Sequence, residues 1–359
     1  MDQKLLLKTV RDKVASGIRI SREEGIALFQ VQDVLALAKI ANEIKEKRTG
    51  KQVTYVVNRQ INPTNICVLS CKFCDYGTKK SRPNAYAMNM EEILSKCSSE
   101  LKEVHIVGGL YHEWTFEHYL NIIRIIHEKF PDIQIKAYTA VEIDFFARQE
   151  KCSVREILIQ LKKVGLVCLP GGGAEVFSER VRKALFPFKI GAPRWLEIHK
   201  TAHELGIRSN STLLYGHMET IEERIDHMLK LRALQDETHG FLSFIPLAYQ
   251  TGNTKVVMRP TSAVDDLKTI AISRILLDNF DHIKSYWVTM GEETASLALH
   301  FGADDLDGTI GEEKIMHAAE AASPIGMAKE RLEYLIKSAA RIPIERNALY
   351  DHFLSALPC

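Results

Sequence analysis

The pattern of apolar and polar positions divides the chain into three parts. Over the first 50 or so residues apolar side chains recur at helical spacing, and Ser21-Arg22-Glu23-Glu24 has the form of a capping box at a helix start. From residue 53 to about residue 310, short β-rich runs alternate with amphipathic helical stretches. We therefore predict an N-terminal helical extension over 1–52, a central α/β body over 53–310 and a helical C-terminal segment over 311–359 packed on that body.

The central body has the pattern of a barrel. Predicted strands cover 53–62, 103–109, 133–140, 164–173, 207–216, 240–249 and 283–291, with a last short strand near 300–308. Predicted helices cover 89–101, 116–130, 154–165, 192–206, 221–238 and 264–280. This spacing predicts parallel strands joined by crossover helices. The predicted fold is a (β/α)8 TIM-type barrel or a partial (β/α)6 barrel, and an open doubly wound sheet is the alternative.

Charge and composition limit the class of partner. The chain has 47 Lys and Arg against 46 Asp and Glu, so nothing indicates attraction to nucleic acid or to an anionic membrane. Charges interrupt the apolar residues of the N-terminal segment, which argues against a signal peptide or a membrane span. We expect a cytoplasmic protein with a small-molecule partner, and the sequence leaves its oligomeric state open.

Three of the seven cysteines lie in one stretch of eight residues that follows the first predicted strand: Cys67, Cys71 and Cys74. Such crowding indicates metal ligation, whereas the four scattered cysteines are expected to be structural: Cys97, Cys152, Cys168 and Cys359. Thiolates suit zinc, copper(I) or iron–sulfur clusters. A closed zinc site needs a fourth ligand, and none follows at zinc-finger spacing. A [4Fe–4S] cluster on three thiolates would keep one iron open for a ligand, while a zinc site or a redox-sensing cluster is the alternative.

The arrangement C-x3-C-x2-C, with Phe73 before the last cysteine, resembles the signature of the radical S-adenosylmethionine superfamily. The resemblance implies that the open iron binds the methionine part of S-adenosylmethionine, and that one electron from the cluster cleaves the sulfonium to a 5′-deoxyadenosyl radical. A zinc-binding nucleic-acid module is the non-enzymatic alternative. It predicts a basic stripe with interleaved aromatic residues, which the sequence lacks.

Further residues receive cofactor-binding roles from the resemblance. Gly108 and Gly109, in the run HIVGG, match the glycine-rich element whose backbone meets the methionine amino group. Leu110 replaces the usual glutamate, which leaves that role to Glu113 or to no carboxylate. Tyr76 and Glu175 are expected to contact S-adenosylmethionine. Arg180 or Arg182 is expected to pair with its carboxylate, although either could equally lie on a solvated helix face.

Other polar residues end the predicted strands and are expected to form a polar mouth above an apolar barrel. They are Glu142, Asn210, Tyr215, His217, Gln250, Asn253, Trp287 and Glu292.

The resemblance narrows over about residues 20–340 to the menaquinone and deazaflavin branch, through runs such as NRQINPTN, LPGGGAEVF and FIPLAY. AYTAVEID, GIRSNSTLLYGHMET and HFGADDLDGTI are most similar to the aminofutalosine synthase family of the futalosine pathway. The resemblance implies a transferase of menaquinone biosynthesis that forms a C–C bond. In that reaction the 5′-deoxyadenosyl carbon adds to 3-[(1-carboxyvinyl)oxy]benzoate, aryl migration and loss of a carboxyl group follow, and S-adenosylmethionine is a co-substrate.

Within this family we expect Arg59, Asn210, Tyr215 and His217 to bind substrate and His217 and Glu142 to act in catalysis. The expected electron donor is a flavodoxin or a ferredoxin. Two rivals remain: the cyclic dehypoxanthine futalosine synthase family, where the radical abstracts hydrogen and leaves as 5′-deoxyadenosine, and the deazaflavin-forming members of the branch.

Overall fold

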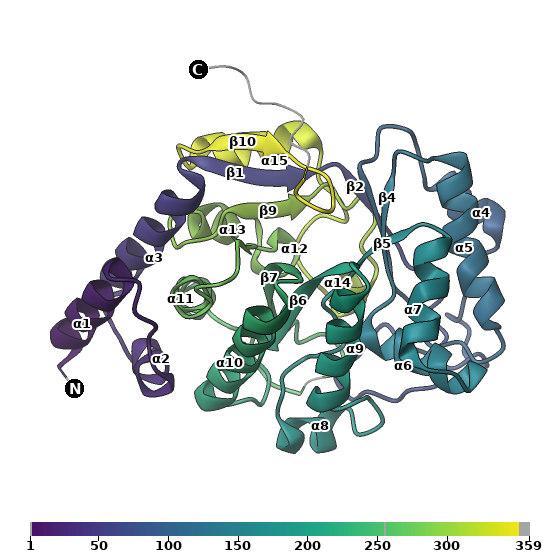
Figure 1. Ribbon diagram of the computed structural model, residues 1–359, viewed down its shortest axis with the longest axis horizontal. Coiled ribbons are helices and arrows are strands. Elements are labelled where there is room, and N and C mark those ends of the chain that lie inside the picture. Colours follow the sequence, from purple (N-terminus) through teal and green to yellow (C-terminus); the bar gives the residue numbers. More distant parts are fainter. Residues whose placement is uncertain (1, 255, 352–359) are drawn as a thin grey trace.

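A ring of parallel strands forms the centre of the protein (Figure 1). The computed structural model describes residues 2–254 and 256–351. The strands are β1 (Gln52–Val56), β2 (Asn58–Ile61), β3 (Glu103–Ile106), β4 (Gln134–Ala137), β5 (Leu166–Leu169), β6 (Arg208–Tyr215), β7 (Phe241–Ala248), β8 (His282–Ile283), β9 (Asp305–Gly308) and β10 (Ile342–Glu345). Strands β2 to β8 form a seven-stranded sheet in sequence order, and each neighbouring pair is parallel.

The two ends of this sheet are joined through β1 and β9. Only Val57 separates β1 from β2, and β9 pairs in parallel with β1. A parallel bridge between Lys284, directly after β8, and Asp305 completes the circuit. The predicted α/β barrel is therefore confirmed. If β1 and β2 are counted as one position, β3 to β9 supply the other seven, so the ring has eight strand positions rather than six.

The described residues form fifteen helices, of which three precede β1 and most of the others return the chain from one strand to the next on the outside of the ring (Figure 1). They are α1 (Gln3–Ala15), α2 (Arg22–Phe29), α3 (Val34–Thr49), α4 (Met90–Ser95), α5 (Phe116–Lys129), α6 (Ala140–Glu150), α7 (Val154–Lys163), α8 (Glu179–Leu185), α9 (Ala192–Glu204), α10 (Ile221–Thr238), α11 (Ala263–Leu276), α12 (Trp287–Met290), α13 (Glu292–Ala298), α14 (Ile315–Ala318) and α15 (Lys329–Ser338). The predicted capping box is confirmed at α2, where Ser21 and Glu24 satisfy each other's backbone N–H groups.

The N-terminal helices α1 to α3 lie beside the barrel, at the purple end of the chain (Figure 1). Helix α3 packs on α11, and α2 packs on both α10 and α11. Leu37, Ile40 and Ala41 of α3 are buried, so an apolar stripe of the predicted helix faces the barrel helices. The division of the chain at 52/53 and 310/311 stays a prediction.

The C-terminal segment is only partly helical, which corrects the prediction of helix throughout. After α15 the chain forms β10, which pairs in parallel with β1. Pro343 gives the physical reason: proline disrupts a helix interior but is tolerated in an edge strand, and β10 is an edge of its sheet. The final predicted residues 352–359, with Cys359, lie outside the described residues.

The predicted strand over 283–291 was also too long. Regular pairing there covers only His282–Ile283, and α12 follows from Trp287. The apolar run that suggested a long strand is buried in this short helix, where the Trp287 indole donates a hydrogen bond to the Gly308 carbonyl at 3.0 Å. A short apolar run fits a buried helix and a buried strand equally well.

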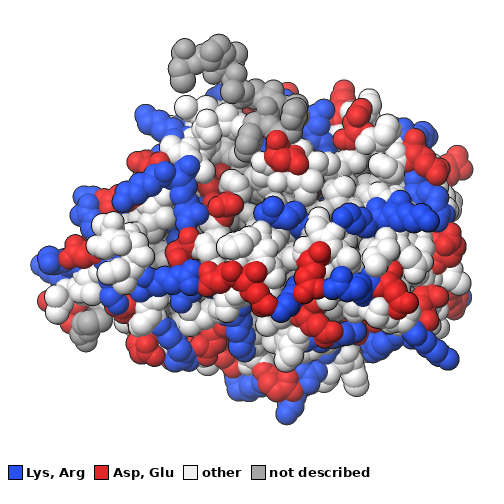
Figure 2. Space-filling view, viewed as in Figure 1, with Lys and Arg blue, Asp and Glu red and all other residues white. Residues whose placement is uncertain are grey.

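The outer surface mixes both signs of charge. On the face shown in Figure 2, Lys and Arg are interspersed with Asp and Glu. Among the described residues, no helix combines the length and the apolar character needed to cross a membrane.

Candidate functional site

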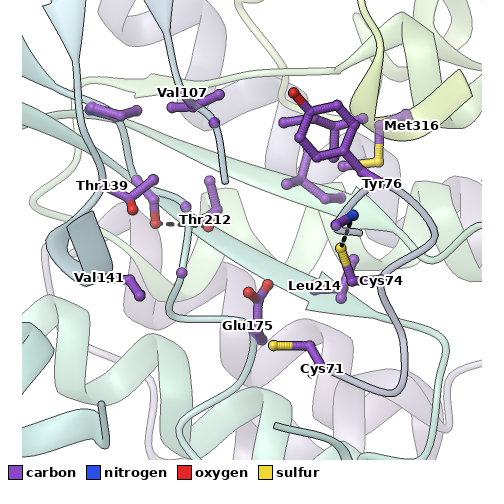
Figure 3. Close-up of a pocket in the computed structure, with 18 of the residues that line it drawn as sticks. Cys71, Cys74, Tyr76, Val107, Thr139, Val141, Glu175, Thr212, Leu214 and Met316 are labelled. Carbon is purple, nitrogen blue, oxygen red and sulfur yellow. Dashed lines mark hydrogen bonds between the residues drawn. The ribbon is translucent and has the colours of Figure 1, made fainter. Parts of the chain in front are cut away.

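A cavity of about 310 Å³ opens into the barrel. Residues on or directly after β2, β3, β4, β5, β6, β7 and β9 line it, together with the loop that carries the three cysteines. Figure 3 shows the carboxylate of Glu175 beside the sulfur of Cys71, with Cys74, Tyr76 and Met316 along one wall. The site therefore forms where loops converge at the carboxyl ends of parallel strands, as the barrel pattern predicts.

Strand alternation decides which predicted residues reach this cavity. On β6 the side chains of Asn210, Thr212 and Leu214 line it, whereas Tyr215 belongs to the opposite face of the strand. On β2, Asn58 and Gln60 line it, and Arg59 between them does not. Successive side chains of a strand point to opposite faces, so Asn210 is brought to the cavity while Arg59 and Tyr215 are directed away from it.

Cys67, Cys71 and Cys74 all line the cavity and are half-buried. Backbone hydrogen bonds hold their loop, from Cys67 N to the Thr78 carbonyl at 2.9 Å and from Cys74 N to the Cys71 carbonyl at 3.2 Å. The Lys79 ammonium donates to the carbonyls of Cys67, Val68 and Leu69 at 2.9, 3.0 and 3.0 Å. The loop thus presents three thiols to one space without help from a ligand.

The donor set fits an iron–sulfur cluster. Within the described part of the chain, no three His, Cys, Asp or Glu side chains converge as ligands of one metal ion. A cubane cluster does not require such convergence, because each thiolate binds a different iron. Burial raises the pKa of Cys71 to about 11. Because the thiolate is the ligand form, binding would displace these protons.

Gly108 and Gly109 allow the cysteine loop to approach β3. A Cβ atom at Gly109 would lie 2.2 Å from the Ile66 carbonyl oxygen, and one at Gly108 would lie 3.0 Å from the Thr64 carbonyl oxygen. The Gly109 N–H donates to the Thr64 carbonyl at 2.8 Å. Both glycines also line the cavity, so this run fixes the loop and leaves backbone open to a ligand.

Tyr76 is buried between the cysteine loop and the barrel. Its hydroxyl donates to the Thr64 carbonyl at 2.8 Å and lies 2.8 Å from the Tyr86 hydroxyl, which donates to the Asn62 carbonyl at 3.0 Å. The ring lines the cavity (Figure 3). Its polar end is thus occupied, and its apolar ring is the part that faces a ligand.

Glu142 lies in the first turn of α6 and not at a strand end as expected. One carboxylate oxygen accepts from the backbone and side chain of Thr139 at 2.7 and 2.8 Å, which completes a capping box. The other oxygen accepts from the Gly108 N–H at 3.2 Å. Burial raises the pKa of Glu142 to about 7. A buried carboxyl group beside the cavity can therefore exchange a proton near neutral pH.

Glu175 and Lys189 form a buried ion pair at the mouth of the cavity, with side chains 11% and 14% exposed. Lys189 also lies 5.0 Å from the ring centre of Phe73. Burial lowers the pKa of Lys189, but the charges of Glu175 and Cys71 outweigh it and the pKa is raised. Lys189 therefore stays protonated beside two of the thiols, and its charge favours their thiolate forms.

Arg180 and Arg182 do not line the cavity. Arg180 donates to Glu223 and to the Met218 carbonyl, both at 2.7 Å. Arg182 pairs with Glu179 and donates to the Pro187 and Lys189 carbonyls at 2.7 and 3.2 Å. Arg182 therefore supports the segment that carries Lys189, and both guanidinium groups are occupied by the protein itself.

His217, Tyr215 and Arg59 likewise lie off the cavity wall. His217 is fully buried, and its Nε2 and Nδ1 atoms bond the Leu214 carbonyl at 3.0 Å and the Met218 N–H at 2.8 Å. Burial lowers its pKa, which favours the neutral ring. The Tyr215 hydroxyl donates to Asp266 at 2.7 Å. These contacts give His217 and Tyr215 structural roles around the end of β6.

The remaining predicted polar residues divide between those that line the cavity and those that do not. Gln250 lines the cavity and donates to the Ala248 and Thr289 carbonyls. Glu292 and Glu113 pair with Arg331 and Lys80, and neither lines the cavity. The Asn253 N–H donates to Asp75 at 3.0 Å, while Trp287 belongs to the core.

The inner end of the cavity, on the barrel strands, is polar, and three of the residues there were not predicted from the sequence. Gln60, His105 and Lys136 are register partners on β2, β3 and β4, and all three line the cavity. Lys136 pairs at 2.6 Å with Glu103, which precedes His105 by two residues on β3 and so lies further from the mouth. We call Gln60, His105, Lys136 and Asn210 the floor of the cavity. A lysine between the apolar residues Ile135 and Ala137 of β4 was the available signal, whereas Lys189 lies on an irregular segment with no such pattern.

A model of the radical SAM superfamily matches residues 61–231, and a model of the CofH/MqnC C-terminal region matches residues 238–357. The chain is 43% identical to aminodeoxyfutalosine synthase of Thermus thermophilus, across 95% of this chain and 94% of that protein. It is 38% identical to aminodeoxyfutalosine synthase of Streptomyces coelicolor, across 96% and 94%. It is 36% identical to cyclic dehypoxanthine futalosine synthase of the same species, across 99% and 90%.

Among solved structures, the fold is similar to that of methylornithine synthase, with a TM-score of 0.76 and 16% identity over 93% of this chain and 97% of that one. Radical SAM enzymes use a [4Fe–4S] cluster and S-adenosylmethionine, and the predicted resemblance is confirmed. The chain belongs to the radical S-adenosylmethionine superfamily, in the family that contains the aminodeoxyfutalosine synthases.

Proposed function

We propose that this chain is an aminodeoxyfutalosine synthase. It joins the 5′-deoxyadenosyl carbon of S-adenosylmethionine to the alkene of 3-[(1-carboxyvinyl)oxy]benzoate. Aryl migration and loss of a carboxyl group as carbon dioxide or bicarbonate then give 6-amino-6-deoxyfutalosine. The observation that carries the proposal is the 43% identity to a synthase of this name along nearly the whole chain, against 36% for the sister enzyme.

Cys67, Cys71 and Cys74 are the proposed cluster ligands. A [4Fe–4S] cluster on them would supply the electron that cleaves S-adenosylmethionine. Lys189 holds positive charge beside the thiolates and orients Glu175 toward the mouth. We propose that Gly108, Gly109, Tyr76 and Glu175 contact S-adenosylmethionine, because all four line the cavity next to the cysteines.

Among the residues predicted to bind substrate, Asn210 is the one on the cavity wall, and we propose it as a substrate contact. Glu142 is the proposed proton carrier, since it lines the same wall with a pKa of about 7. His217, Tyr215, Arg180 and Arg182 act on the site through the segments they hold in place. We propose a cytoplasmic enzyme with a flavodoxin or ferredoxin as electron donor.

The test is an anaerobic assay of the reconstituted, reduced protein with S-adenosylmethionine and the enolpyruvyl benzoate. Mass spectrometry should find a covalent adenosyl adduct with the mass of 6-amino-6-deoxyfutalosine, together with methionine. A protein with alanine at Cys67, Cys71 and Cys74 is the control for chemistry that does not depend on the cluster. Free 5′-deoxyadenosine without adduct would overturn the proposal.

The sister activity is the second candidate, supported by 36% identity over 99% of the chain. In the same assay, dehypoxanthine futalosine replaces the benzoate. Cyclisation of that compound with release of 5′-deoxyadenosine would transfer the assignment to cyclic dehypoxanthine futalosine synthase.

A further inference from the structure

The floor of the cavity holds more hydrogen-bond donors than the protein satisfies. Lys136 is buried, and within the described part of the chain Glu103 is the carboxylate that lies within ion-pair distance of its ammonium. An ammonium has three N–H groups, so donors remain beyond this contact. The ion pair lies at the inner end of a cavity whose mouth carries the cysteines.

Two further groups of the floor lack partners. The Nε2 atom of His105 is buried without a hydrogen bond to any described residue. Asn210 lines the cavity, its side-chain oxygen accepts from the Ser243 hydroxyl at 2.9 Å, and its NH2 group has no acceptor among the described residues. An unsatisfied buried polar group costs about 1–3 kcal/mol, so these groups together indicate an acceptor supplied from outside the chain.

The protonation states favour an anionic acceptor. Burial and the neighbouring Lys136 charge lower the pKa of His105 to about 3, so its ring is neutral and can donate one N–H. Burial lowers the pKa of Lys136, but the Glu103 and Asp307 charges outweigh it and the pKa is raised, which keeps the ammonium charged. A charged donor flanked by neutral donors suits a carboxylate better than a second cation.

We propose that the floor, formed by Gln60, His105, Lys136 and Asn210, binds the carboxylate of an aromatic acid, with Lys136 as its charged partner. This inference rests on the proposed function, whose benzoate ring carries such a group at the end remote from the alkene. Binding at the floor would place the aromatic ring between the floor and the mouth, with the alkene toward the cysteines. Lys136 would thereby decide which substrates are accepted.

The test compares 3-methoxybenzoate with the neutral 3-methoxybenzamide by anaerobic calorimetry. The protein carries its reconstituted cluster and S-adenosylmethionine, and no reductant is added, so no turnover occurs. Wild-type protein should bind the benzoate at least tenfold more tightly. In Lys136→Met the benzoate should bind roughly 10- to 100-fold more weakly, as expected for loss of a charged hydrogen bond. Affinity for the benzamide should change less than about threefold.

Lys45→Met is the matched control. Lys45 is as buried as Lys136 and donates to the Gly50 and Gln52 carbonyls at 2.8 Å, but it does not line the cavity. Its substitution should keep the preference for the benzoate. If Lys136→Met does not fold, Asn210→Leu should reduce that preference about 3- to 10-fold, as for one neutral hydrogen bond.

A wild-type protein without preference for the benzoate, or a preference that survives Lys136→Met or Asn210→Leu, would overturn the inference. The proposed function fails separately. A protein that shows the Lys136-dependent preference but forms no adenosyl adduct with the enolpyruvyl benzoate keeps the carboxylate site and loses the proposed reaction.

Discussion

At the mouth of the cavity, the three cysteines lie on a loop held by backbone hydrogen bonds and by close approach to glycines, whereas the floor projects from barrel strands that carry buried charge. The cysteines are half-buried and contribute little to the core. Beneath the floor, Glu103 lies among Lys136, Arg346 and Asn58 and is almost fully buried. Residues at the mouth therefore serve mainly the chemistry of the site, whereas residues at the floor also contribute to the stability of the fold.

This difference predicts that substitutions at the two ends fail in different ways. A change at the mouth should remove cofactor binding and lower the free energy of unfolding less than a change beneath the floor does. A change beneath the floor should lower the free energy of unfolding before it affects any ligand. The predictions below separate these outcomes.

The largest effect is expected at the cysteines. Replacing Cys67, Cys71 or Cys74 with alanine should abolish the cluster and all turnover, because the remaining two thiolates cannot hold it. Iron content and the absorbance at about 400 nm typical of such clusters report the loss. Cys152→Ala is the control, since Cys152 is half-buried but does not line the cavity. Full cluster content and turnover in any of the three variants would contradict the ligand assignment.

Beneath the floor, Glu103→Gln should destabilise the fold by about 3–5 kcal/mol, because it removes the partner of a buried charge. Burial raises the pKa of Glu103, but the Lys136 and Arg346 charges outweigh it and hold the pKa at about 2, so the carboxylate is charged at neutral pH. Denaturant unfolding measures the change. Glu113→Gln is the control, since its pair with Lys80 is exposed and screened by solvent and should contribute little to stability. Equal losses of unfolding free energy in the two variants would refute the contrast between the buried and the exposed ion pair.

The periodicity of the sequence was sufficient to predict the barrel, because buried parallel strands and amphipathic helices have different apolar spacings. It did not predict β10, although Pro343 argues against a helix there, and it did not predict α12, because the apolar run of α12 is equally typical of a buried strand. The cysteine loop was predictable because its ligands are close in sequence. The floor was harder to predict: Asn210 was among the predicted residues, whereas Gln60, His105 and Lys136 come together only through barrel register.

Arg59 and Tyr215 show a second limit on predicting the cavity residues from the sequence. Both residue types suit a carboxylate ligand, but the face of a strand decides where a side chain goes, and each lies one position from a residue that lines the cavity. Applying the two-residue alternation to β2 and β6 would have selected Gln60, Asn210 and Thr212. Lys189 had no comparable signal, because an irregular segment and the ion pair with Glu175 bring it to the mouth.

Glu142 links the cysteine side of the barrel to α6 and should make stability depend on pH. Its pKa of about 7, raised by burial, exceeds the unfolded value of 4.5. The folded state therefore keeps a proton that the unfolded state loses, and stability is full below pH 4.5 and falls as the pH rises through 7. Relative to Glu142→Gln, wild-type protein should lose up to about 3 kcal/mol across this range.

Unfolding free energies of the two proteins, measured at several pH values, give the difference directly. The altered hydrogen bonds of the amide shift the variant by a constant amount and leave the slope unaffected. Parallel pH profiles would mean that folding leaves the pKa of Glu142 unshifted, so that the group is ionised at neutral pH, and would remove it as a proton carrier.

The smallest effect is expected for Glu175→Gln. Its carboxylate lies at the mouth beside Cys71 and is oriented by Lys189, so the amide should weaken S-adenosylmethionine binding by roughly tenfold through loss of a charged hydrogen bond. Iron content should stay unchanged, because Glu175 is not a ligand. The unfolding midpoint should fall less than in Glu103→Gln, because the Lys189 ammonium keeps the neighbouring thiolates as charged partners. Calorimetric titration measures the affinity, with Glu179→Gln, whose exposed carboxylate pairs with Arg182, as control. Unchanged affinity would restrict Glu175 to holding Lys189, and a loss of stability as large as that of Glu103→Gln would refute the contrast between mouth and floor.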